Sequence, residues 1–67
     1  GCFLAARSGV SGGASLGENC FLGAGAMVRD GIRVGARVQM GLLSAVVKDI
    51  PDGSVVAGNP AILIKNH

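Results

Sequence analysis

The sequence contains no tryptophan, no tyrosine and no threonine among its 67 residues, and only two phenylalanines. It has one histidine, His67, and two cysteines, Cys2 and Cys20, which do not form a CxxC pair. No basic run and no aromatic platform are present, so we expect no nucleic-acid partner. No apolar stretch approaches the length of a membrane span, and no signal-peptide pattern is seen. We therefore expect a cytoplasmic chain without membrane insertion, in which both thiols are reduced.

Glycine, in contrast, is abundant, with 12 residues, while the formal net charge is only +2. So much glycine without the three-residue period of collagen indicates many tight turns or closely stacked backbone. A chain of this length buries only roughly 60% of its unfolded surface, so an ordinary globule needs additional stabilisation.

A six-residue repeat dominates the sequence. Leu, Ile, Val and Met make up 20 of the 67 residues, so eight consecutive matches at one spacing are expected by chance in roughly one sequence in a thousand or fewer. The repeated aliphatic positions are Leu4, Val10, Leu16, Leu22, Val28, Val34, Met40 and Val46.

A second position repeats with the same period. Four residues after each aliphatic residue stands a small or aliphatic one: Ser8, Ala14, Cys20, Ala26, Ile32, Val38, Ser44 and Ile50. Between the two positions, at the fourth place of the hexad, fall Gly13, Asn19, Gly25 and Gly31, which tolerate the positive φ of a tight corner. A period of six fits neither a helix nor a heptad, but it fits one short strand followed by one corner.

Three such units make one triangular turn of 18 residues, which stacks Leu4 on Leu22 and Met40, Val10 on Val28 and Val46, and Leu16 on Val34. The predicted fold class is all-β: a parallel β-helix of about 2.7 coils within residues 1–51, followed by a C-terminal strand, loop and tail over 52–67. A solenoid needs capped ends, and the repeat is already in phase at Leu4. We therefore expect a fragment of a longer ancestor, or a chain that depends on oligomerisation. The alternative is a compact two-layer β domain with a fortuitous pattern.

The C-terminal part carries two further motifs. Val46-Val47-Lys48-Asp49-Ile50-Pro51 is similar to the V-x-K-D-[IV]-P hexad that closes the helix in hexapeptide-repeat acyltransferases, and Val55-Val56-Ala57-Gly58-Asn59-Pro60-Ala61 is similar to the V-V-x-G-x-P-A strand and loop that follows it. The residues before these motifs resemble bacterial sugar O- and N-acetyltransferases of the sialic-acid O-acetyltransferase type. The resemblance implies a left-handed β-helix, whereas general topology rules favour right-handed crossovers.

The resemblance also implies a homotrimer with acetyl-CoA in a groove between neighbouring β-helices. One corner of the predicted helix collects small residues, and backbone bare of bulky side chains suits an extended pantetheine arm. Lysine ammonium groups suit the CoA phosphates, and the Asn59-Pro60 loop suits the adenine end. The expected cofactor-binding residues are Gly23, Ala24, Gly41, Leu42, Lys48, Asn59 and Lys65. Alternatively, the glycines serve only corner geometry, the lysines are surface residues and the loop is an ordinary turn.

The resemblance implies a histidine as the general base, and the sequence does not provide one in the repeat. His67 is the terminal residue, and Arg7 and Gly13 stand where relatives often carry histidine. Arginine stays protonated and cannot act as a base. Glu18, Asp30 and Asp49 are expected to be solvated corner residues. We therefore assign no catalytic residue.

No metal site is expected either, since a γ-type carbonic anhydrase of this fold binds zinc through three histidines. The predicted function is the C-terminal, acyl-CoA-binding part of a hexapeptide acetyltransferase acting on a sugar or amino-sugar, inactive on its own. The alternative is a non-catalytic trimeric β-helix that acts as an assembly module or a truncated, free-standing gene product.

Overall fold

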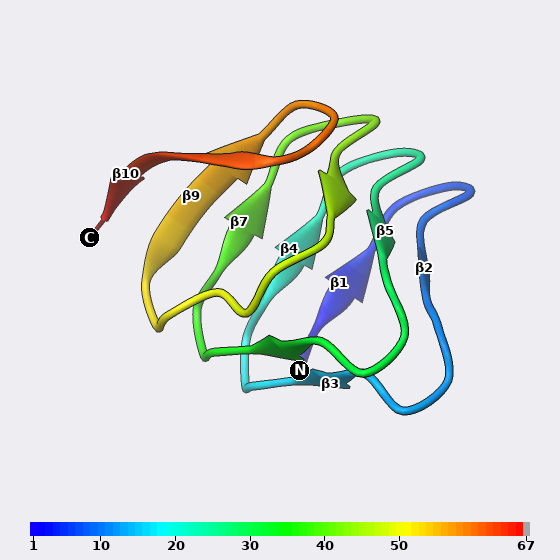
Figure 1. Cartoon of the computed structure of the whole chain (residues 1–67), viewed down its shortest axis with the longest axis horizontal. Helices are drawn as coiled ribbons and strands as arrows, with labels where there is room; N and C mark the ends of the chain where they lie inside the picture. The colour runs from blue at the N-terminus through cyan, green and yellow to red at the C-terminus, as the bar shows by residue number, and fades with distance from the viewer. Residues whose placement is uncertain (67) are drawn as a thin grey trace.

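The computed structural model describes residues 1–66, and for Asn66 only its backbone. The chain winds into a three-sided solenoid whose short strands alternate with tight corners (Figure 1). The strands are β1 (Phe3–Leu4), β2 (Gly9–Val10), β3 (Ser15–Leu16), β4 (Phe21–Leu22), β5 (Met27–Val28), β6 (Arg33–Val34), β7 (Gln39–Met40), β8 (Ala45–Val46), β9 (Ser54–Ala57) and β10 (Ile62–Asn66). The structure contains no helix in residues 1–66 that is long and apolar enough to cross a membrane.

Successive coils stack in parallel on each of the three sides. The sheets have the orders β1-β4-β7-β9-β10, β2-β5-β8 and β3-β6. The register places Leu4 opposite Leu22, and Leu22 opposite Met40, as the 18-residue turn predicts. The other two predicted stacks are confirmed as well. The fold is therefore an all-β, left-handed parallel β-helix of about three turns.

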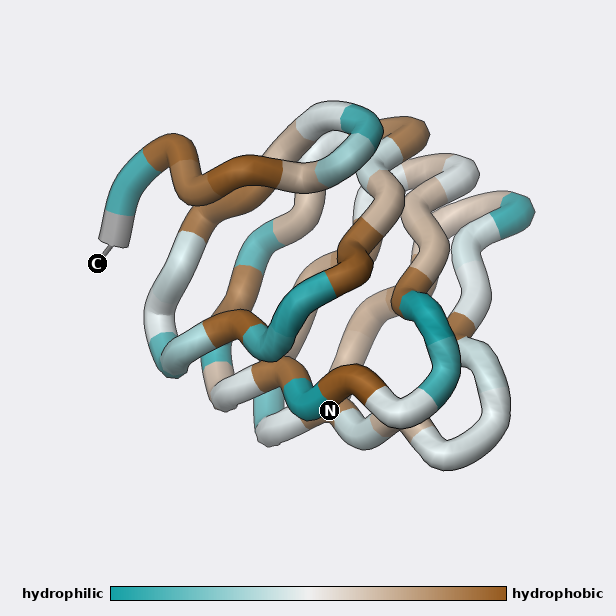
Figure 2. Tube along the Cα trace, viewed as in Figure 1, coloured by the Kyte–Doolittle hydropathy of each residue, from teal (hydrophilic) through white to brown (hydrophobic). Residues whose placement is uncertain are grey.

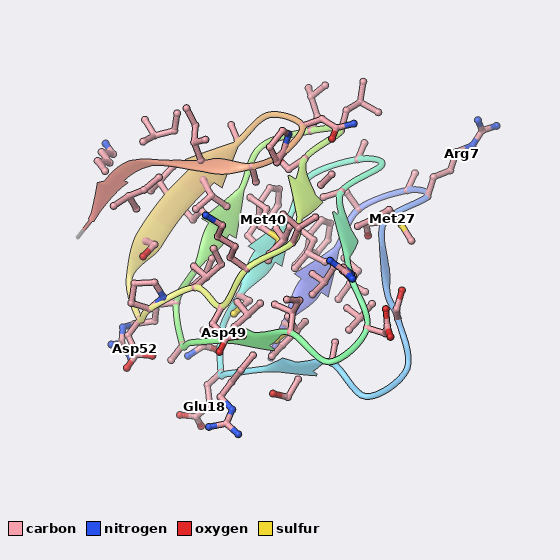
Figure 3. All side chains as sticks on the ribbon, in the orientation of Figure 1. Arg7, Glu18, Met27, Met40, Asp49 and Asp52 are labelled. Carbon is pink, nitrogen blue, oxygen red and sulfur yellow. The ribbon has the colours of Figure 1, made fainter. Side chains whose placement is uncertain are left out.

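Both repeated positions point into the narrow interior. The fully buried set consists of Cys20, Leu22, Ala26, Val28, Val34, Val38, Met40, Val46 and Val56. Met40 lies inside the solenoid, while Met27 lies on its outer surface (Figure 3). Ile32 and Ile50 are half-buried, and Leu4 in the first coil is the one repeated residue that is exposed, at 45%. Leu4 is paired with β4 on one side and with no strand of the described residues on the other.

The corners depend on positive φ angles at the fourth hexad position. Gly13, Asn19, Gly25 and Gly31 have φ between 56° and 78°, which confirms the predicted corner. Three further residues at this position, Arg7, Arg37 and Leu43, adopt φ of 57° to 60° although they carry Cβ atoms. The left-handed region disfavours such residues, so the stacked coils impose this conformation against local preference.

The repeat shortens by two residues in the third coil. Val56 follows Met40 by 16 residues and pairs with it in parallel, and Ile50 likewise bridges to Val34. The prediction that Ile50 occupies the small-residue position is therefore wrong: it takes the place of the aliphatic residue. The corner between Val46 and Ile50 is two residues shorter than the others, so each later residue pairs with the one 16, and not 18, positions before it.

Aspartate side chains replace main-chain acceptors at this irregular coil. Asp49 Oδ1 accepts a hydrogen bond from the Arg33 N–H at 2.9 Å, and Asp52 Oδ1 accepts one from the Ala36 N–H at 2.8 Å. Figure 3 shows both carboxylates on the same side of the solenoid. The expectation that Asp49 is merely solvated is thus incomplete, because its exposed carboxylate also stabilises the shortened corner.

The C-terminal residues end the parallel stack by reversing direction. β9 pairs in parallel with β7, and β10 then returns antiparallel to β9, with a register shift between Leu63 and Lys65. The parallel ladder thus continues into β9, while the division of the chain at residue 51 stays a prediction.

Truncation of Leu22 tests the interior stack. Leu22 is 0% exposed and lies between Leu4 and Met40, so Leu22→Ala leaves a cavity between two coils. We expect a loss of about 2–5 kcal/mol in the free energy of unfolding, measured by urea denaturation. Leu4→Ala removes the same atoms from a half-exposed site and serves as the control. Equal losses in the two variants would contradict the burial gradient along the solenoid.

A Cβ at Gly23 tests the stacking of the corners. It would lie 2.7 Å from the Leu42 nitrogen and 2.8 Å from the Gly41 carbonyl carbon, both backbone atoms that cannot rotate away. We expect Gly23→Ala to destabilise the fold by roughly 1–3 kcal/mol in thermal or urea unfolding. A Cβ at Gly12 meets nothing within 4 Å, so Gly12→Ala should be neutral or stabilising by a few tenths of a kcal/mol. An unchanged stability for Gly23→Ala would contradict the close approach of the coils.

Candidate functional site

One edge of the solenoid carries four stacked layers. Residues 5–8, 23–26, 41–44 and the loop 57–60 follow the four strands of the largest parallel ladder and lie one above another. Main-chain hydrogen bonds join the layers: Gly25 N–H to Ala6 O at 2.9 Å, Leu43 N–H to Ala24 O at 2.8 Å, and Ala45 N–H to Gly58 O at 2.9 Å. We call these four layers the first edge.

Two main-chain donors along the first edge are unused. Ala24 and Leu42 are exposed, Leu42 by 69%. Within residues 1–66, the N–H groups of both residues donate no hydrogen bond. The equivalent N–H on another edge, that of Ala36, is occupied by the Asp52 carboxylate. The first edge therefore has unused main-chain donors in consecutive layers, as the second edge has at Gly12 and Asp30. Its side chains range from the small Ala24 to the large, exposed Leu42.

The glycines of this edge have a structural reason of their own. Gly23 is buried against the backbone of the layer above it, and a Cβ at Gly41 would lie 3.0 Å from the Ala57 Cβ. Gly17 is placed in the same way, since its Cβ would lie 2.5 Å from the Ala36 nitrogen on a different edge. Coil stacking thus explains glycine at this hexad position whether or not a ligand binds, while a cofactor contact at Gly23 or Gly41 stays a prediction.

Of the other predicted residues, Asn59 belongs to the first edge and the lysines do not. Asn59 is exposed in the loop of its fourth layer, where the Asn59-Pro60 peptide bond is cis. Lys48 is exposed in the shortened corner after β8, on another edge. Lys65 is exposed on β10, opposite Val55 and away from the β9 end that enters the first edge. Within the chain, therefore, five of the seven predicted residues lie along the first edge.

An apolar hollow lies at the C-terminal end of the solenoid and was missed from the sequence. It has a volume of about 290 Å³ and is lined by residues 48–51, Val56 and residues 61–63. The neighbouring apolar run 62–64 remains more than half exposed and appears brown in Figure 2. The three consecutive apolar residues of this run, which break the six-residue pattern, are the sequence feature that could have indicated the hollow. Lys48 borders this hollow and not the first edge.

The described residues provide no obvious proton acceptor beside the first edge. Arg7 lies in its first layer with φ 60°, and its guanidinium projects away from the body (Figure 3). Glu18 and Asp30 are exposed on the other two edges. His67 lies outside the described residues. Within residues 1–66, no three His, Cys, Asp or Glu side chains are grouped closely enough to hold a metal ion.

Comparison with known proteins identifies the repeat. The family model for the hexapeptide repeat of succinyl-transferase matches residues 1–28 and 13–43. Serine acetyltransferase 2 of Arabidopsis thaliana is 46% identical over 50 residues, which are 75% of this chain and 16% of that protein. Galactoside O-acetyltransferase of Lactococcus lactis is 46% identical over 46 residues, which are 69% of this chain and 22% of that protein.

Solved structures agree with the fold and extend the match to nearly the whole chain. The acetyltransferase domain of PglB from Neisseria gonorrhoeae, in complex with acetyl coenzyme A, superposes with a TM-score of 0.91 at 38% identity, over 94% of this chain and 31% of that one. PerB from Caulobacter crescentus, in complex with CoA and GDP-perosamine, gives 0.90 at 40% identity, over 92% and 30%. The chain thus spans less than a third of each relative. Its repeat, its three-sided coil and these similarities show that the chain belongs to the hexapeptide-repeat acyltransferase family.

Proposed function

We propose that this chain is the C-terminal, acyl-CoA-binding part of a hexapeptide acetyltransferase that acts on a sugar or amino-sugar acceptor. The observation that carries the proposal is the first edge, with unused N–H groups at Ala24 and Leu42 in adjacent layers beside the glycine positions Gly23 and Gly41. Solved relatives in complex with acetyl-CoA, or with CoA and an amino-sugar nucleotide, support the choice of cofactor and acceptor class.

The chemistry of pantetheine fits this edge. Its extended arm carries amide carbonyls that accept hydrogen bonds, and layers of a parallel ladder lie about 4.8 Å apart. Two unused N–H groups in adjacent layers therefore form a row of donors along the helix axis. Asn59, in the fourth layer of the same edge, extends this row with a side-chain amide. When bound, acetyl-CoA supplies the activated acyl group, while the chain itself orients the arm.

A homotrimer supplies the second wall of the groove in this proposal. A single convex edge covers only one side of a ligand, whereas small-molecule sites bury most of the ligand surface. Phe3 and Phe21 stack outside the first sheet with ring centroids 5.3 Å apart, and Met27 lies outside the second; all three are 45% exposed or more. These outward apolar side chains suit contact between copies. In such an assembly, Lys48 or Lys65 reaches the CoA phosphates from the neighbouring protomer. We place the assembly in the cytoplasm.

Catalysis needs more than this edge provides. Removing the proton of a hydroxyl or amine requires a base near the thioester, and Arg7 is permanently protonated. We therefore assign the chain a binding role without turnover. The second candidate is a non-catalytic trimeric β-helix that acts only in assembly. It is favoured by Gly23, whose lack of a side chain is explained by coil stacking alone. The two candidates differ in that the assembly module does not bind CoA.

Affinity for acetyl-CoA is the first test. We expect Ala24→Glu, which places a bulky anion beside the unused N–H groups, to raise the dissociation constant for acetyl-CoA by at least about tenfold in titration calorimetry. Gly12→Glu adds the same group at the equivalent hexad position of the second edge, where a Cβ meets nothing within 4 Å. We expect it to leave affinity unchanged. Light scattering should show trimers for both variants. Equal affinity in the two variants would refute the first edge as the site, and a trimer without affinity would support the assembly module.

Turnover is the second test. We expect the chain, with acetyl-CoA and an amino-sugar acceptor, to release free CoA thiol no faster than the same mixture without protein, since residues 1–66 place no base beside the first edge. The release of thiol is followed colorimetrically over a range of pH. Acceptor-dependent release above that background would show that the chain carries a catalytic group of its own.

A further inference from the structure

The two cysteines lie one above the other at the start of the solenoid. They are 18 residues apart, the length of one coil, and each immediately precedes a residue of the paired strands β1 and β4, in which Phe3 lies opposite Phe21. The N–H of Phe3 donates to the carbonyl of Cys20 at 2.9 Å, which holds the two backbones together at this point. Cys2 and Cys20 are therefore neighbours in adjacent coils.

Both thiols converge on one acceptor. The Cys2 thiol donates to the carbonyl of Gly17 at 3.2 Å, and the Cys20 thiol approaches the same oxygen at 3.5 Å and the Gly35 carbonyl at 3.1 Å. Neighbouring strands lie about 4.8 Å apart, within the range of Cα separations that a disulfide spans. Both cysteines are free in the structure.

The environments of the two thiols differ. Cys2 is exposed, whereas Cys20 is 2% exposed and belongs to the buried core. Burial raises the pKa of the Cys20 thiol, and the adjacent Cys2 thiol raises it further. Cys2 is therefore the accessible nucleophile, and Cys20 is a shielded thiol that external reagents do not reach directly.

We infer that Cys2 and Cys20 form a redox modification site that a low-molecular-weight disulfide, such as oxidised glutathione, converts to an intrachain disulfide. The Cys2 thiolate attacks one sulfur of the oxidant, which breaks its S–S bond and releases one thiol. The Cys20 thiolate then attacks the Cys2 sulfur of the mixed disulfide and releases the second thiol. The protein loses two electrons and two protons, and the oxidant becomes two thiols.

The new bond joins the first coil to the second. The first coil is the least buried layer, as the exposure of Leu4 shows. A disulfide that closes a loop of about one coil restricts the unfolded chain and opposes separation of this layer. The site does not depend on CoA binding.

The experiment treats the full chain with oxidised glutathione under anaerobic conditions. We expect the intact mass to fall by two hydrogens, and a non-reducing tryptic digest to contain residues 1–7 linked to residues 8–29. The thermal midpoint should rise by roughly 10 °C and return on reduction. Below the pKa of Cys20, the closure rate should increase about tenfold per pH unit, because only its thiolate attacks.

The serine variants control for the pairing. Cys2→Ser should take up no glutathione and should show no change in midpoint on oxidation, whereas Cys20→Ser should stop at a glutathione adduct on Cys2. A wild-type chain that also stops at this adduct would overturn the inference. Cross-linking of separate chains through Cys2 would do the same, as would an intrachain disulfide that leaves the midpoint unchanged. Because Cys2 is exposed, its serine variant retains the buried core.

Discussion

The main-chain ladder between coils is the interaction on which the rest of this structure depends. Most strands contain only two residues, and such strands have no stability in isolation. Each gains order only because its N–H and C=O groups pair with the coils on either side, as Gly9 N–H does with Ala26 O and Met27 N–H with Ser44 O. A solenoid of this kind is stabilised layer by layer, by contacts between neighbours.

The ladder explains features that local preference does not. Arg37 and Leu43 adopt positive φ because the corner must return the chain to the next side within four residues. Gly17 and Gly23 lack side chains because the coil above approaches their Cα atoms more closely than a Cβ allows. Local strain at the corners is thus offset by hydrogen bonding and by apolar burial in the interior.

The period of six was sufficient to predict the strands, the inward residues and the register of the first two coils. It depends on residue types that the interior and corners require, and these are visible without a structure. The shortened corner before Ile50 could not be predicted, because an aliphatic residue suits both interior positions and its phase is set by pairing with Val34. The roles of Asp49 and Asp52 could not be predicted either. The sequence does not distinguish an aspartate that is only solvated from one that accepts a main-chain N–H.

The candidate site was only partly predictable. Small residues at Gly23-Ala24 and Gly41-Leu42 could be assigned to one edge because the period places them there. The sequence could not show that the four-layer edge includes Asn59, since this requires β9 to pair with β7 despite the missing two residues. The sequence also could not show that the two lysines lie away from this edge. The position of Lys48 depends on the irregular coil, and that of Lys65 on the antiparallel β10.

The three edges are chemically unequal although the repeat that builds them is the same. At each corner, the N–H of the third residue of the hexad donates no main-chain hydrogen bond within residues 1–66, which leaves it free for another acceptor. At Ala36 the Asp52 carboxylate accepts it, which makes the donor part of the fold. At Ala24 and Leu42 on the first edge, and at Gly12 and Asp30 on the second, no group within residues 1–66 accepts it. The two-residue shortening therefore has two effects: it brings Asp52 over the third edge and leaves the regular layers of the first edge intact. One irregular coil thus makes the third edge chemically distinct from the other two, and this requires no change in the repeat itself.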